Sequence, residues 1–308
     1  MRLIVTGGSG FIGSHVVDKA IEAGHEVRVF DTRPSPYGAE TIVGDVTDFD
    51  AIAAAASGCD AILHLAAMAD VNEVAGAPVT TETVNARGTL FVLEAARMAN
   101  VGRVVYASTI WVYGEHVDGI ATEDTPLGIP RHIYTATKLA GEMYCHSYGE
   151  LYGVEHTILR FGIPYGPRAR EAAVLPQFVI RAQAGEALTI AGTGEQSRRF
   201  VYVEDLADGV IAALQPAAAN RIYNLVGDES VTIREIAELV AELVHPVEIV
   251  HTEGRKGDFP GVEVSGKRAA DELGWRAETP FAEGARRYVE WFIESTSSAA
   301  DGSFAKSA

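Results

Sequence analysis

Arg2-Leu-Ile-Val-Thr-Gly-Gly-Ser-Gly-Phe-Ile-Gly13 is the segment that decides the fold. Its apolar residues 3–5 predict a buried parallel strand, and the apolar spacing beyond the glycines predicts a helix. Gly7 permits the tight turn between them, Gly10 leaves room for a pyrophosphate, and Gly13 lets the helix pack closely on the strand. A purely structural turn is the alternative, but a glycine pattern between a strand and a helix favours dinucleotide binding at the helix N-terminus.

The next 150 residues continue the alternation of strands and helices. Apolar runs predict strands at 26–30, 41–46, 60–65, 103–107 and 155–161, and helical periodicity predicts helices ending near 57 and spanning 80–100 and 133–152. Strands that alternate with helices form parallel sheets with right-handed crossovers. The fold class expected is therefore α/β, a Rossmann-like doubly wound parallel sheet.

The pattern changes after residue 164, where Pro164, Gly166 and Pro167 interrupt the chain. Helices are expected near 175–184, 204–214, 233–244 and 281–293, with short strands among them. We therefore expect a dinucleotide-binding domain at 1–164 and a smaller mixed α/β substrate domain at 165–294. Residues 295–308 lack apolar periodicity and are expected to be disordered.

Composition excludes several classes of partner. The 308 residues carry a net charge of -17 and are 47% hydrophobic, so nucleic acid and anionic membranes are not expected as partners. No apolar run reaches membrane length, and Met1 leads directly into a strand, which leaves no room for a signal peptide. Cys59 and Cys145 have no metal-binding spacing, and no metal site is expected. These observations favour a cytoplasmic protein with reduced thiols.

An acidic residue follows the second predicted strand. Asp31 lies about 20 residues beyond the glycine turn, where a carboxylate accepts hydrogen bonds from the adenosine ribose and repels a 2′-phosphate. This position favours NAD over NADP, although Arg33 nearby could pair with a phosphate. A solvated aspartate at a strand end is the alternative interpretation.

A second chemical pattern lies on the helix predicted at 133–152. Tyr134 and Lys138 are four residues apart and therefore share a helix face. A lysine cation one turn away lowers the pKa of a phenol, which otherwise titrates near 10, so that it can exchange a proton with a substrate hydroxyl. Thr109, at the tip of the fifth strand, can bond the same hydroxyl. Alone, such a pair is most often ordinary helix surface; with the glycine turn it indicates hydride-transfer chemistry.

These patterns together resemble the extended short-chain dehydrogenase/reductases, in particular the NAD-dependent sugar epimerase/dehydratase family. The similarity covers residues 1 to about 294 and is greatest to UDP-glucose 4-epimerases. Besides the glycine turn and the Tyr-Lys pair, the residues on which this resemblance rests are Asp31, Gly44-Asp-Val46, His64-Leu-Ala-Ala67, Asn85, Ser108-Thr109, Tyr165-Gly-Pro167, Arg198, Arg255 and Leu273-Gly-Trp275.

The resemblance implies a role for each matching position. Thr109, Tyr134 and Lys138 would be catalytic. Residues expected to bind NAD are Gly7, Gly10, Phe11, Ile12, Gly13, Asp31, Asp45, Val46, Leu65, Ala66, Ala67, Asn85, Tyr134 and Lys138. The partner expected is a nucleotide-diphosphate sugar, in particular a UDP-sugar, and the residues expected to bind it are Thr109, Tyr134, Gln177, Arg198 and Arg255. Guanidinium groups suit a diphosphate, although ordinary surface arginines are the alternative.

The residues after Thr109 bear on the reaction. Relatives that dehydrate or decarboxylate sugars carry acidic residues there, and related reductases carry a cysteine, whereas this chain has Ile110 and Trp111. The remaining set suits a 4-epimerase. Another nucleotide-sugar enzyme (dehydratase, decarboxylase or reductase), a dehydrogenase acting on a non-nucleotide substrate, and a non-enzymatic dinucleotide sensor stay open. Ile163 stands where many members have an asparagine that contacts the substrate.

The family also implies a homodimer. Its members commonly pair through the two helices expected here at 80–100 and 133–152. Apolar residues on these helices could form the contact or simply face the sheet; they are Leu90, Leu93, Ala96, Met98, Leu139, Met143 and Tyr148.

Overall fold

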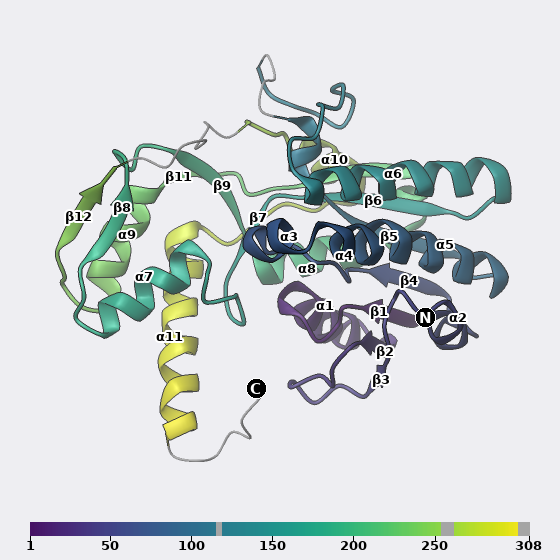
Figure 1. Cartoon of the computed structure of the whole chain (residues 1–308), viewed down its shortest axis with the longest axis horizontal. Helices are drawn as coiled ribbons and strands as arrows, with labels where there is room; N and C mark the ends of the chain where they lie inside the picture. The colour runs from purple at the N-terminus through teal and green to yellow at the C-terminus, as the bar shows by residue number, and fades with distance from the viewer. Residues whose placement is uncertain (115–118, 254–261, 301–308) are drawn as a thin grey trace. The chain divides into compact units, whose positions relative to one another are not determined.

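The chain forms two compact units in a computed structural model that describes residues 1–114, 119–253 and 262–300 (Figure 1). The first unit contains residues 1–162, 206–225 and 262–276, and the second contains 163–205, 226–261 and 277–308. The chain first crosses between units two residues before the boundary expected at 164. Two later segments then return to the first unit, so the units are not contiguous in sequence.

A parallel sheet forms the centre of the first unit. Within the described residues it has seven strands in the order β10-β6-β5-β4-β1-β2-β3, and every neighbouring pair is parallel. The strands are β1 (Arg2–Thr6), β2 (Glu26–Asp31), β3 (Thr41–Val43), β4 (Ala61–His64), β5 (Arg103–Thr109), β6 (His156–Phe161) and β10 (Arg221–Leu225). The predicted fold class is confirmed, and the later segment 221–225 adds a strand that the sequence did not indicate.

Helices cover both faces of this sheet. Ile4, Ile62 and Val104 belong to one core cluster with residues of three helices, α2 (Phe49–Ala56), α5 (Gly88–Met98) and α6 (Ile133–Tyr152). The neighbouring residues Leu3 and Val5 are equally buried and point to the other face. Near-continuous apolar strands are typical of parallel sheets buried on both sides. The helices of this unit include α1 (Phe11–Glu22), α2 (Phe49–Ala56), α3 (Val71–Gly76), α6 (Ile133–Tyr152) and α10 (Lys267–Leu273), with α8 (Val203–Ala212) entering it from the second unit.

The helix predicted at 80–100 is present, but it contains a π-helical turn that the sequence did not indicate. The structure has α4 (Pro78–Glu82), a π-helical turn η1 (Thr83–Arg87) and α5 (Gly88–Met98). Inside the π-turn, the Asn85 side chain bonds groups outside the helix, and the Thr89 hydroxyl donates to the Asn85 carbonyl oxygen over 2.6 Å. Hydrophobic periodicity does not distinguish such a turn from a regular helix.

The second unit is a mixed α/β body. Its described strands are β7 (Ile163–Tyr165), β8 (Leu188–Ala191), β9 (Ser197–Tyr202), β11 (Ser230–Thr232) and β12 (Ile249–Thr252), in sheets ordered β11-β9-β7 and β12-β8. Its helices are α7 (Val174–Gln183), α9 (Ile233–Leu243) and α11 (Phe281–Ala300). These elements enclose a core that includes Tyr165, Phe178 and Phe281.

The last helix extends beyond its expected end. Residues 295–300, expected to lack regular structure, continue α11, and residues 301–308 lie outside the described residues. The hydroxyls of Ser295 and Thr296 donate to the Phe292 carbonyl oxygen, both over 2.9 Å, so these polar residues are accommodated in a helix. None of the helices described is both long and apolar enough to cross a bilayer.

Candidate active site

The glycine turn lies between β1 and α1 as predicted. Gly7 has a φ of +72°, and a Cβ atom on it would lie 2.7 Å from the Ala66 nitrogen. A Cβ atom on Gly13 would lie 2.1 Å from the Gly7 carbonyl oxygen, so only glycine allows the helix to approach this closely. At Gly10, the added atom would meet Gly7 oxygen at 3.2 Å and nothing else within 4 Å. Phe11 and Ile12 follow as the first, half-buried residues of α1.

Asp31 ends β2, the strand beside β1. Its Oδ2 accepts a hydrogen bond from the Ser9 backbone nitrogen over 3.0 Å, so the turn and the carboxylate hold each other in place. Oδ1 faces the Arg33 backbone nitrogen at 3.4 Å. A carboxylate fixed beside a glycine turn suits the ribose of a dinucleotide.

Smaller groups line the neighbouring strand ends. Leu65, Ala66 and Ala67 follow β4, which pairs with the other edge of β1, and all three are half-buried. Val46 is 5% exposed, whereas Asp45 beside it is exposed and accepts a hydrogen bond from the Thr47 nitrogen over 2.9 Å. The open turn at the α1 N-terminus, the carboxylate and these small residues occupy the carboxyl edge of adjacent strands. That donor set and shape fit NAD.

The three residues predicted to be catalytic also lie in the first unit. Thr109 ends β5, and its Oγ1 accepts from the Trp111 backbone nitrogen over 3.3 Å. Lys138 Nζ donates to the Ala107 carbonyl oxygen over 2.7 Å and lies 5.9 Å from the centre of the Tyr134 ring. Burial lowers the pKa of Lys138 to about 8. The helix face and the strand tip predicted from sequence thus belong to one structural unit.

Asn85 supports the start of α6. Its Nδ2 donates to Met68 oxygen over 2.9 Å and to Thr137 Oγ1 over 3.1 Å, and its Oδ1 accepts from the Met68 nitrogen over 2.8 Å. The Thr137 hydroxyl in turn donates to the Tyr134 carbonyl oxygen over 2.7 Å. The π-turn therefore connects to the backbone of Tyr134 through two side chains.

His64 is a buried polar residue behind the site. Nδ1 lies 2.7 Å from Thr6 Oγ1, and Nε2 lies 3.0 Å from Thr89 Oγ1. The single hydroxyl proton of Thr89 is used on the Asn85 carbonyl, so His64 Nε2 carries the proton and Nδ1 accepts from Thr6. Burial, and secondarily the charge of Lys138, lowers the His64 pKa to about 3, which keeps the ring neutral.

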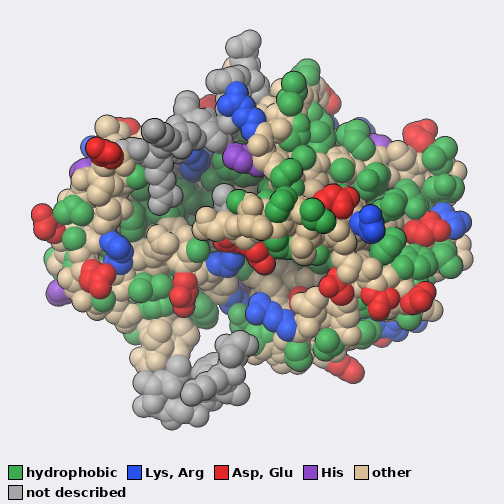
Figure 2. Space-filling model, viewed as in Figure 1, with side chains coloured by type: hydrophobic (Ala, Val, Ile, Leu, Met, Phe, Trp, Pro, Cys, Tyr) green, Lys and Arg blue, Asp and Glu red, His purple; other side chains and the backbone are tan. Residues whose placement is uncertain are grey.

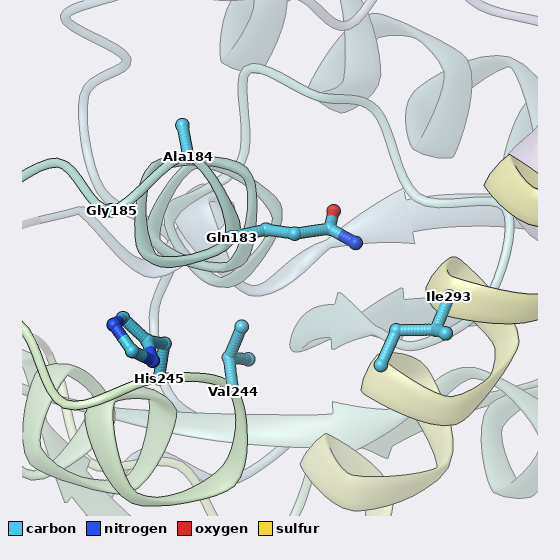
Figure 3. A pocket seen from close by; sticks show the side chains of 6 residues that line it. All are labelled: Gln183, Ala184, Gly185, Val244, His245 and Ile293. Atoms are coloured by element: carbon cyan, nitrogen blue, oxygen red, sulfur yellow. The ribbon is translucent and has the colours of Figure 1, made fainter.

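Two of the remaining predicted substrate residues, Gln177 and Arg198, belong to the second unit. Gln177 is exposed on α7, and Arg198 on β9 donates from Nη1 to the Ser197 oxygen over 2.8 Å. Arg255 lies outside the described residues. An open pocket of about 470 Å³ in this unit is lined by Gln183, Ala184, Gly185, Val244, His245 and Ile293 (Figure 3). Sequence reasoning named none of its lining residues.

Sequence reasoning also missed a buried ion pair next to Ser108, the residue before Thr109. Glu142 and Arg160 have side chains 0% and 2% exposed, and Arg160 Nη2 lies 2.8 Å from Glu142 Oε2. One signal was present in the sequence, because Glu142 continues the four-residue spacing of Tyr134 and Lys138. In the described ranges, no three His, Cys, Asp or Glu side chains are placed to hold a metal ion.

Comparisons with known proteins agree with this arrangement. The family profile described as the NAD dependent epimerase/dehydratase family matches residues 3–226. A UDP-glucose 4-epimerase from Mycolicibacterium smegmatis is 33% identical over 309 residues, covering 95% of this chain and 98% of that protein. UDP-glucuronic acid decarboxylase 1 from Danio rerio is 32% identical over 305 residues, covering 94% of this chain and 72% of that protein.

A solved structure is similar throughout. The crystal structure of UDP-glucose 4-epimerase with UDP-glucose from Thermotoga maritima has a TM-score of 0.90 and 31% identity, covering 96% of this chain and all of that chain. Epimerase and decarboxylase relatives have similar identities, so sequence identity does not separate their reactions. The glycine turn, the Tyr-Lys helix and the extent of these matches place this chain in the NAD-dependent epimerase/dehydratase family.

Proposed function

We propose that this protein is an NAD-dependent nucleotide-sugar 4-epimerase. The observation that carries the proposal is the turn after β5, where Ile110 and Trp111 follow Thr109 in a short 3-10 helix, η2 (Ile110–Tyr113). Neither side chain can give or take a proton. Elimination of water or assisted decarboxylation would require an acid or base at this place, whereas epimerisation at C4 requires only the residues that act on the 4-hydroxyl.

The roles of the three catalytic residues follow from their chemistry. Tyr134 takes the proton of the 4-hydroxyl and later returns it, and Thr109 bonds the same oxygen. Lys138 supplies the positive charge that favours the phenolate, and its bond to Ala107 oxygen fixes it there. NAD, when bound, would supply the hydride acceptor and donor for C4. The glycine turn and Asp31 would bind its phosphates and ribose.

The substrate proposed is a UDP-sugar. The Thermotoga maritima relative was solved with UDP-glucose, and the Mycolicibacterium smegmatis relative is a UDP-glucose 4-epimerase. Arg198 and Arg255 would bind the diphosphate, because planar guanidinium groups form paired hydrogen bonds with phosphate, and Gln177 would lie near the base. A cytoplasmic location, which suits the free thiols of Cys59 and Cys145, is part of the same proposal.

A homodimer formed through α5 and α6 completes the proposal. Leu93 and Ala96 are fully buried in the core, so they cannot form this contact. Met98 and Met143 are 57% and 45% exposed, and hydrophobic side chains lie among charged ones over the region of these helices (Figure 2). Light scattering at micromolar concentration should give twice the chain mass, and a monomer mass would contradict the dimer.

The activity test uses purified protein with no added cofactor. It is incubated with UDP-glucose, UDP-galactose, their N-acetyl derivatives and UDP-glucuronic acid, and products are followed by mass and proton NMR. A product of unchanged mass inverted at C4 supports the epimerase. Loss of 18 or 44 mass units would instead identify a dehydratase or a decarboxylase. Tyr134→Phe serves as the control, because it should remove turnover while leaving the fold and bound NAD intact.

A further inference from the structure

Glu142 and Arg160 form a buried ion pair outside the three residues proposed to be catalytic. Arg160 on β6 donates to Glu142 on α6 twice, from Nε over 3.0 Å and from Nη2 over 2.8 Å. Such a pair is costly to bury, because both ions lose their hydration. Since apolar residues could fill the same volume, this cost calls for a role other than stability.

The pair belongs to a closed ring of contacts around Thr109. The Ser108 hydroxyl donates to Glu142 Oε1. Arg160 Nη1 donates to the Tyr113 hydroxyl over 2.9 Å, and Tyr113 ends η2, whose first turn is capped by Thr109 Oγ1. The ring thus leaves β5 at Ser108, passes through α6 and β6, and returns to the residues just after Thr109.

The ring also holds the helix that carries the acid/base pair. Tyr134, Lys138 and Glu142 are spaced by four residues, so they share one face of α6. Lys138 bonds Ala107 oxygen, and Glu142 bonds Ser108, the next residue of β5. Two consecutive strand residues therefore hold two consecutive turns of the helix, which leaves α6 little freedom to slide along β5.

We propose that Glu142 and Arg160 are positioning residues of the active site, which fix Thr109 relative to Tyr134 and Lys138 while adding no net charge. The inference rests on the proposed function only for the role of those three residues. Charge balance matters because Glu142 lies eight residues, about 12 Å, along the helix from Tyr134. An unbalanced charge at that distance, at an effective dielectric constant near 20, shifts a titration by about one pH unit.

Other ionisable groups lie near Lys138, Glu142 and Arg160, and none of them is substituted in the experiment below. His64, Tyr106 and Cys145 lie close enough to influence, or be influenced by, Lys138 or Glu142. Arg160 Nη1, which donates to Tyr113, also lies 3.5 Å from the Glu123 backbone carbonyl oxygen, and the Glu123 carboxylate is 3.7 Å from Arg268 Nε.

The experiment compares four variants of the NAD-bound protein. Ser108→Ala removes one bond of the ring and no charge. Glu142→Gln leaves Arg160 positive, and the double variant Glu142→Gln with Arg160→Met restores neutrality without the pair. Glu155→Gln is the matched control: it breaks the contact of Arg103 and Glu155 (2.9 Å), which links the opposite ends of the same two strands. The readouts are the turnover rate on any sugar converted and the titration midpoint of Tyr134, measured by carbon-13 NMR of labelled tyrosine.

Ser108→Ala should lower turnover about tenfold with an unchanged midpoint. Glu142→Gln should lower the midpoint by about one pH unit, since the remaining guanidinium favours phenolate, and the double variant should restore the midpoint but not the rate. Glu155→Gln should change neither. Unchanged turnover in Ser108→Ala, or an unchanged midpoint in Glu142→Gln, would reduce the pair to a structural contact. If Glu142→Gln does not fold, the turnover of Ser108→Ala still tests the proposal. If the wild-type protein converts no sugar, the proposed function is wrong, and the NMR titration of Tyr134 still tests the positioning role of the pair.

Discussion

Replacing Lys138 by methionine is expected to stabilise the cofactor-free protein while removing its activity. Lys138 is 4% exposed, and burial lowers its pKa from the usual 10.5 to about 8. At about 1.4 kcal/mol per pH unit, the folded state loses about 3 kcal/mol at neutral pH by holding this ammonium group. The variant also loses the hydrogen bond to the Ala107 oxygen, which costs it about 1 kcal/mol. Lys138→Met should therefore gain about 2 kcal/mol in free energy of unfolding.

The stability difference between Lys138→Met and the wild type should decrease as the pH rises. Below pH 8, lysine is protonated in both the folded and the unfolded state, and the cost is present in full. Between pH 8 and 10.5, the folded protein releases the proton while the unfolded chain keeps it, so wild-type stability rises with pH relative to the variant. From pH 7 to pH 9 the advantage of Lys138→Met should therefore shrink by about 1 kcal/mol.

Urea unfolding of both proteins at pH 7 and pH 9 measures this difference. Turnover should fall at least about a hundredfold, since the variant lacks the charge that we propose favours the Tyr134 phenolate. Lys267→Met is the control, because Lys267 has a side chain 75% exposed and pairs with Asp271; it should change stability by less than about 0.5 kcal/mol with no pH trend. A variant less stable than wild type at pH 7, or a gap independent of pH, would refute the reasoning.

Three further outcomes test other parts of the site. Gly13→Ala should destabilise the protein by about 1–3 kcal/mol in urea unfolding, because the added atom meets Gly7 oxygen at 2.1 Å; Gly76→Ala, where nothing lies within 4 Å, should not, and equal effects would contradict the packing argument. Asp31→Ser should lower the preference for NAD over NADP about tenfold or more in binding titrations, since a unit charge facing a 2′-phosphate disappears; an unchanged ratio would remove Asp31 from the cofactor site. His64 should show a single neutral Nε2–H tautomer by nitrogen-15 NMR from pH 5 to 9, because its pKa is about 3; a titration in that range would contradict the assigned hydrogen bonds.

The parts of the fold that could be predicted are those encoded by local patterns. The backbone geometry at Gly7 and Gly13 could be predicted because glycine tolerates a positive φ and a close backbone approach far better than other residues. Gly7 has the positive φ, and Gly13 has the close approach. The helix over 133–152 was predicted to the residue, since Gly153 at its end adopts a left-handed conformation with a φ of +69°. Tyr134 and Lys138 could be proposed as an acid/base pair from sequence because such a pair needs only one helix face, and the structure has the helix that was predicted.

Features that depend on distant contacts were not predictable. Strand β10 joins the sheet beside β6, and Gly162 nitrogen bonds Leu225 oxygen, yet no local signal in 221–225 assigns this strand to the first unit. The π-turn at Asn85 likewise depends on Met68 and Thr137, which are 17 and 52 residues away. Periodicity identifies a helix, but the contacts that deform it are tertiary.

The buried pair of Glu142 and Arg160 shows where this limit falls within the site. Glutamate and arginine are usually solvent-exposed, so a charged residue following Tyr134 and Lys138 at the same spacing is most simply interpreted as surface. That interpretation is wrong because Glu142 pairs with Arg160 on β6, and no pattern in the sequence of α6 predicts this partner. Residues that act on a ligand must carry particular chemistry at particular spacing and can therefore be found by motif. Residues that hold them need only a partner, which can come from anywhere in the chain, so the support of this site required the structure.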